Sequence, residues 1–116
     1  MKVSEAIRRA NDLRINELSD EQKTAWLYNL EGEIADFMHE DVTAVNGYPH
    51  EDPELLMPAP HDDIYYLYLC AMIDSYHQEE SQYNNDMALF NAAMAGARAW
   101  WRRTHKAPNR EYWRVM

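Results

Sequence analysis

Three triplets of imidazole and carboxylate side chains are the part of this chain best suited to chemistry. They occupy residues 39–41, 50–52 and 61–63, eleven residues apart, and begin with His39, His50 and His61. Imidazole and carboxylate groups are suitable ligands for zinc and other divalent ions. A metal-dependent enzyme is therefore one hypothesis that the sequence raises.

The spacing of the triplets has a simpler explanation in the local sequence. Eleven residues make about three helical turns, which would align the triplets on one face of a continuous helix. Four prolines between residues 49 and 60 exclude that helix, because proline lacks the backbone donor and obstructs the preceding turn. Asp62 and Asp63 suit the start of a helix, and His39 suits the end of one. Since HExxH and paired-cysteine spacings are absent, we predict no metal ligands.

Motifs for nucleophilic catalysis and for phosphate binding are also missing. Cys70 is the single cysteine and lies in an apolar run, as is typical of a buried free thiol. With three glycines, the chain has no Gly-rich phosphate loop and no Gly-x-Ser-x-Gly elbow. We therefore predict that the protein is not an enzyme, has no catalytic or cofactor-binding residues and uses no cofactor.

Charge is strongly segregated along the chain. Residues 24–97 hold fourteen of the twenty acidic residues and no Lys or Arg. Residues 98–116 hold six basic residues against the single Glu111, and the whole chain has a formal charge of −9. Such an acidic body should repel duplex DNA, whereas the basic end should favour an acidic partner.

The elements that must position these groups are predicted to be helices. Apolar residues recur at three- and four-residue spacings in four segments, and the expected helices are a short amphipathic one near the N-terminus and longer ones over about residues 20–41, 62–78 and 85–104. Ser4 is the expected cap of the first helix, and Ser19 with Gln22 is typical of a reciprocal cap on the second. The predicted fold class is all-α, a small bundle of about four helices.

The third and fourth predicted helices carry further information. The third is apolar nearly all round, which is typical of a helix at the centre of a core or between subunits. The fourth is rich in alanine, which allows another helix to approach closely. We expect the two to form an antiparallel hairpin around residues 80–85.

A long Pro-rich loop is predicted over residues 42–60, and loops of this length are often functional or mobile. We expect a helical domain over residues 1–105 and a flexible basic and aromatic tail over residues 106–116. No apolar run is long enough to cross a membrane, and the N-terminus lacks the apolar region of a secretion signal. The sequence is therefore expected to be that of a soluble protein made in the cytoplasm.

Two segments mix aromatic residues with cations. Residues 99–106 contain the ingredients of a single-strand nucleic-acid platform, but the acidic remainder of the chain favours a core or protein-interface role for the tryptophans. In the tail, Arg110, Tyr112, Trp113 and Arg114 are of the types enriched at binding hot spots, so we predict a docking peptide. A simple disordered tail, or the remnant of a tag, is the alternative.

One pattern of residues runs through the second half of the chain, namely Pro58, Pro60, Asp62, Asp63, Tyr65, Tyr68, Met72, Ile73, Asp74, Tyr83, Asn84, Asn85, Met87, Phe90, Asn91, Arg103, Thr104, His105 and Pro108. This pattern resembles small proteins from the structural-gene clusters of tailed phages and prophages of Gram-positive bacteria. It is similar to the head-tail connector, or head-completion adaptor, family, closely over residues 58–108 and more loosely over residues 19–34.

This resemblance implies a structural virion protein with an all-helical fold and no catalytic residues. It would assemble as a ring under the portal, extend the DNA channel and sit in the virion, or in the host cytoplasm during assembly. The implied partners are other copies of the chain, the portal and the tail or stopper proteins; DNA passes without specific binding, and no membrane is involved. Candidate interface or channel residues are Glu51, Asp52, Glu54, Asp62, Asp63, Trp100, Arg102 and Arg103.

An acidic phage-encoded inhibitor, or DNA mimic, that binds a host protein is the alternative from a different class. The acidic body favours it, and the basic end counts against it because a mimic needs continuous negative charge.

Overall fold

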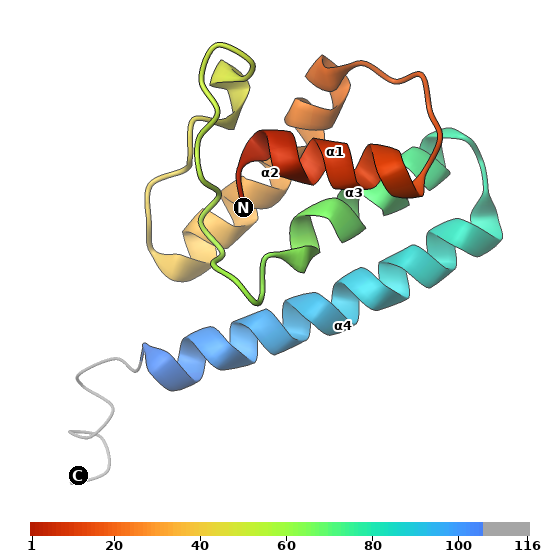
Figure 1. Cartoon of the computed structure of the whole chain (residues 1–116). Coiled ribbons are helices and arrows are strands. Elements are labelled where there is room, and N and C mark those ends of the chain that lie inside the picture. The colour runs from red at the N-terminus through yellow and green to blue at the C-terminus, as the bar shows by residue number, and fades with distance from the viewer. Residues whose placement is uncertain (106–116) are drawn as a thin grey trace, which may run out of the picture.

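Four α-helices make up most of the computed structural model, which describes residues 1–105. They are α1 (Val3–Leu13), α2 (Asp20–Met38), α3 (Asp63–Tyr76) and α4 (Glu80–Thr104), with a short 3-10 helix, η1 (Val45–Gly47), between α2 and α3. Within residues 1–105 there is no β-strand, although Lys2 and Glu54 form one isolated bridge. In Figure 1, α4 is a long rod below the other three helices. The predicted all-α fold is confirmed.

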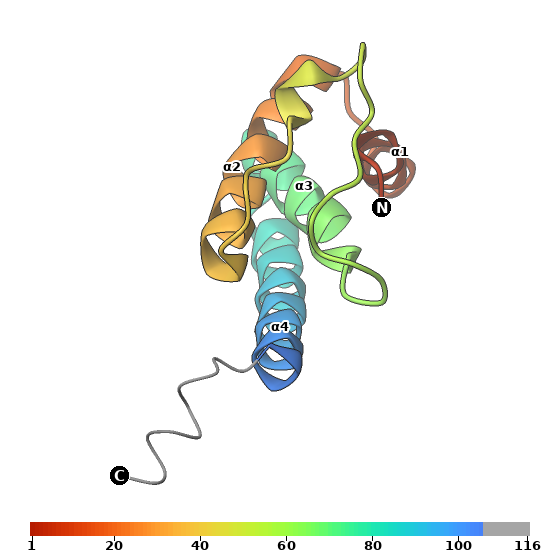
Figure 2. The same cartoon turned by 90° about the vertical axis from the view of Figure 1, so that its left-hand side faces the viewer.

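Helix α3 occupies the centre of the molecule. It packs against α1, α2 and α4, and Figure 2 shows it between α1 and α2 with α4 beneath. Its buried residues face several directions and include Ile64, Tyr65, Leu69, Cys70 and Ile73. Packing within one chain thus accounts for the apolar residues on nearly all sides of α3. These residues therefore do not indicate contacts between subunits.

The start of α2 follows its sequence signals, but its end does not. The Ser19 hydroxyl accepts a hydrogen bond from the backbone N–H of Gln22 at 3.1 Å, which provides one half of the predicted reciprocal cap. The helix ends at Met38, before the predicted residue 41, because His39 adopts a left-handed conformation with φ of 57°. That conformation lets the N–H of Glu40 turn back to the carbonyl of Ala35 at 2.9 Å.

The predicted turn between the third and fourth helices is wrong. Residues 80–85 already belong to α4, and the chain reverses over residues 77–79 instead. Gln78 takes the left-handed conformation there, with φ of 59°, and the N–H of Glu79 reaches the carbonyl of Asp74 at 2.9 Å. The turn contains neither glycine nor proline, so the usual sequence signals for a turn are absent.

Asp52, in the loop, provides the cap that Ser4 was expected to supply for α1. The backbone N–H of Ser4 donates to Asp52 Oδ1 at 3.0 Å, and the Ser4 hydroxyl donates to Asp52 Oδ2 at 2.6 Å. The hydrogen bond from the Ser4 side chain lowers the pKa of the Asp52 carboxyl. Asp52, 48 positions further along the chain, therefore accepts hydrogen bonds at the start of α1, where backbone N–H groups have no partner within the helix.

Backbone and apolar contacts also hold the Pro-rich connection between α2 and α3, residues 39–62. The N–H of Leu55 donates to the carbonyl of Met1 at 2.9 Å, and the N–H of Val3 donates to the carbonyl of Pro53 at 3.3 Å. The side chains of Val45, Leu55 and Met57 are buried in the core. The loop is therefore part of the packed domain.

Candidate functional site

A buried ion cluster joins the end of α1 to α3 and α4. Arg14, directly after α1, donates from Nε to Asp74 Oδ1 on α3 at 3.1 Å. Its Nη2 donates to both carboxylate oxygens of Asp86 on α4, at 2.9 and 2.8 Å. Asp74 and Asp86 are only 1% and 5% exposed. A single guanidinium thus compensates two buried carboxylates, and its removal would leave both without a counter-charge.

The two carboxyl groups of the cluster compete for that one cation. Burial and the neighbouring Asp86 raise the pKa of Asp74 to about 7, although Arg14 acts in the opposite direction. Burial also raises the pKa of the adjacent Cys70 thiol to about 11, so the thiol stays protonated and is a poor nucleophile near neutral pH. The cluster can therefore gain or lose a proton near neutral pH through Asp74.

The raised pKa of Asp74 predicts how the free energy of unfolding depends on pH. The pKa of Asp74 is raised above its ordinary value of 3.8, so between the two values the folded chain holds a proton that the unfolded chain has released. The stabilisation is complete below the lower value and is lost as the pH rises through about 7. In urea unfolding, we expect the free energy of unfolding to be lower at pH 8.5 than at pH 5.5 by on the order of 1–3 kcal/mol.

Matched variants separate this contribution from other titrating groups. Asp74→Asn should flatten the dependence on pH, because the amide cannot bind the proton. Asp36→Asn, on the exposed face of α2, should keep the slope of the native chain. An unchanged slope in Asp74→Asn would show that the cluster does not take up the proton.

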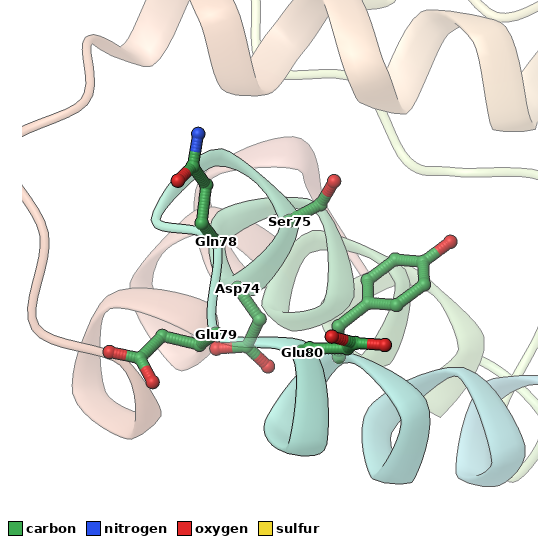
Figure 3. Close-up of a pocket in the computed structure, with 6 residues that line it drawn as sticks. Asp74, Ser75, Gln78, Glu79 and Glu80 are labelled. Carbon is green, nitrogen blue, oxygen red and sulfur yellow. The ribbon is translucent and has the colours of Figure 1, made fainter.

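A small hollow lies against this cluster at the turn between α3 and α4 (Figure 3). Its volume is about 270 Å³, and it is lined by Asp74, Ser75, Gln78, Glu79, Glu80 and Tyr83. Figure 3 shows the side chains of Gln78 and Glu79 pointing away from Asp74. The volume falls below the range of about 300–1,000 Å³ that is typical of ligand pockets. The acidic rim is thus a surface feature and does not form a convergent ligand site.

A second buried polar group fixes the loop to the core. Glu31, on α2, accepts hydrogen bonds from the Tyr65 hydroxyl at 2.7 Å and from the N–H of Leu56 at 2.8 Å. The Tyr65 oxygen in turn accepts from the N–H of Met57 at 2.8 Å. Glu31 and Tyr65 are fully buried, and burial strongly raises the pKa of the Tyr65 hydroxyl. This network ties the loop to α2 and α3.

The three histidine triplets do not converge. His39 ends α2, His50 is exposed in the loop, and His61 packs against Trp100 with the ring centres 4.9 Å apart. In the part of the chain that the structure describes, no group of three or more His, Cys, Asp or Glu side chains could hold a metal ion. The eleven-residue spacing therefore does not assemble a metal site from the triplets within residues 1–105.

Most acidic candidates in and after the loop gather around the start of α1. Glu54 and Asp62 lie 3.0 and 3.5 Å from the amino group of Met1. Asp63 lies 3.9 Å from Arg9, and Asp52 caps α1. Glu51 is exposed. The structure thus brings the acidic interface or channel candidates near one another, and most of them already have partners within the chain.

The remaining candidates lie near the end of α4. Trp100 and Trp101 are half-buried, with ring centres 6.1 Å apart, and Trp101 stacks on His105 at 3.3 Å. Arg102 lies over the ring of Phe37 at 5.5 Å, and Arg103 is exposed. The structure thus places both tryptophans against the domain. The tail residues Arg110, Tyr112, Trp113 and Arg114 lie outside the described residues.

The sequence interpretation missed both buried polar clusters. A signal existed for two of their members, since Glu31 lies on the apolar face of α2 and Asp74 lies within the largely apolar α3. Their partners could not be identified from the sequence, because Arg14 lies 60 and 72 positions from Asp74 and Asp86.

None of the helices within residues 1–105 has both the length and the apolar character needed to span a membrane. Polar and charged residues interrupt even the longest helix, α4.

Comparisons with protein-family models, with curated proteins and with solved structures give no match for this chain.

Proposed function

We propose that this protein is a structural adaptor that assembles with copies of itself into a ring under a phage portal and extends the DNA channel. The observation that carries the proposal is the separation of charge along α4. Glu79 and Glu80 stand at its start, whereas Arg98, Arg102 and Arg103 stand at its end. Opposite charges on different patches favour a head-to-tail contact between copies, and such contacts close into rings when the rotation between subunits allows it.

An exposed face of α4 supports this assembly. Ala88, Ala92, Ala95 and Ala99 are all exposed and recur at alternating spacings of four and three residues. Helix seams use this spacing, and small residues let a second helix approach closely. Burial of these alanines against another copy therefore costs little side-chain entropy.

The acidic surface suits the proposed passage of DNA. Glu51 and Glu54 are exposed on the loop, and residues 24–97 contain no Lys or Arg. A channel lined by such carboxylates repels phosphate and keeps DNA from adhering. In the proposed adaptor, the portal and the tail or stopper proteins meet the two ends of the ring.

One substitution on the alanine face tests the assembly. Native mass spectrometry of the full chain, alone and with a phage portal protein, should show oligomers that Ala92→Arg shifts to monomers. The reason is that a long charged side chain prevents close helix approach. Ala25→Arg, on the exposed face of α2, is the matched control and should leave the oligomers unchanged. A native chain that stays monomeric at high concentration and does not bind portal would contradict the proposal.

A binding protein that mimics DNA is the second candidate, favoured by the fourteen acidic residues of the stretch 24–97. It predicts that the chain competes with duplex DNA for host DNA-binding proteins in gel-shift experiments. The cluster of Arg98, Arg102 and Arg103 weakens this candidate, because it interrupts the negative surface.

A further inference from the structure

Exposed apolar side chains gather at one end of the molecule. Three of the six large exposed hydrophobic residues of the described part lie there, namely Ile15 at 96%, Tyr76 at 62% and Leu13 at 54% exposure. Ile15 and Tyr76 line one hollow of about 450 Å³, together with Asn16, Glu17, Leu18 and His77. Figure 1 shows this end, with the loop after α1 and the turn before α4, opposite the C-terminal end of α4. We call Ile15, Glu17, Tyr76, His77, Glu79 and Glu80 the turn-end patch.

The charge of the turn-end patch is negative. Glu17, Glu79 and Glu80 are exposed, and the nearby Arg14 is already paired with Asp74 and Asp86. Lys23 is buried, and its Nζ donates to the carbonyl of Leu18 at 3.0 Å. A partner for this surface must therefore supply both apolar area and positive charge.

We propose that the turn-end patch binds residues 106–116 of a second copy of this chain. That segment contains Tyr112, Trp113 and Val115, which supply apolar area, and Lys106, Arg110 and Arg114, which supply positive charge. Aromatic residues flanked by arginines are the types that dominate binding energy at interfaces. Tyr112 and Trp113 would cover Ile15 and Tyr76, and the arginines would face Glu79 and Glu80.

The reach of the chain favours a tail that comes from another copy. Helix α4 has 25 residues, which at a rise of about 1.5 Å each make it roughly 37 Å long. The patch lies at the start of α4, whereas Trp113 follows Thr104 by nine residues. Nine extended residues span at most about 32 Å, so within one chain the backbone of Trp113 would fall short of the start of α4 even at full extension, whereas a second copy can supply the tail without that extension.

The proposed contact is head-to-tail, because the patch of one copy meets the tail of the next. It adds a second contact, beside the alanine face of α4, to the self-association in the proposed function and to that extent rests on it. It does not depend on what the assembly binds, so a failure of portal binding and a failure of this contact are distinguishable.

Single variants of the full chain provide the first test. Ile15→Asp and Trp113→Ala should each weaken self-association at least tenfold in sedimentation velocity experiments. Val42→Asp is the matched control, since Val42 is also exposed but lies in the loop after α2, away from the patch; it should leave association unchanged. A native chain that is strictly monomeric, or variants that associate as the native chain does, would overturn the inference.

A mixture of the two variants provides the sharper test. The Ile15→Asp chain keeps an intact tail, and the Trp113→Ala chain keeps an intact patch, so the mixture should associate at least tenfold more tightly than either variant alone. Failure of the mixture to associate would overturn the inference. If Trp113→Ala abolished portal binding but not self-association, the tail would bind portal; the proposed function would then stand without this contact.

Discussion

Replacement of Arg14 by methionine should lower the free energy of unfolding by about 3–5 kcal/mol at pH 8. The change leaves Asp74 and Asp86 buried and without their shared counter-charge. A loss of this size is a large fraction of the stability of a small domain, so the variant should be partly unfolded at physiological temperature. The loss should be smaller at pH 5.5, because Asp74, whose pKa is raised to about 7, is then protonated.

Urea unfolding of the two chains at both pH values measures this effect. Arg8→Met is the matched control, since Arg8 also lies on α1 but is exposed; its effect should stay within about 0.5 kcal/mol. If Arg14→Met were no more damaging than Arg8→Met, the ion cluster would not contribute to folding. A loss of equal size at both pH values would instead contradict the role of Asp74 as the group that takes up the proton.

The second large effect is expected at Tyr65. Tyr65→Phe should lower the free energy of unfolding by about 2–4 kcal/mol, because Glu31 loses a donor and the N–H of Met57 loses its acceptor. The ring itself remains, so no cavity forms. Tyr28→Phe, at an exposed tyrosine on α2, is the control and should change stability by less than about 0.5 kcal/mol.

Amide hydrogen exchange distinguishes local from global loss in the Tyr65→Phe variant. The amides of Leu56 and Met57 hydrogen-bond to this network, so their protection should fall more than that of amides in the middle of α3. Equal loss of protection in both regions would mean that Tyr65 stabilises the whole domain and not the loop in particular.

The parts of the fold that depend on local sequence were predicted well. The four helices follow from apolar spacing, and Ser19 caps α2 as its hydroxyl chemistry requires. The boundary between α3 and α4 was predicted wrongly, because the turn uses Gln78 in a left-handed conformation, which the side-chain type does not signal. The polar residues 80–85 resembled a loop but form the first turns of α4.

The sequence by itself determined the helical class, the segregation of charge and the absence of a continuous helix through the prolines, since each depends on neighbours within a few residues. The tertiary structure decided which buried polar groups meet. Arg14 pairs with two carboxylates far along the chain, Asp52 caps α1, and Glu31 holds the loop. A buried charge needs a partner wherever the fold can supply one, so these pairings follow from packing and not from spacing.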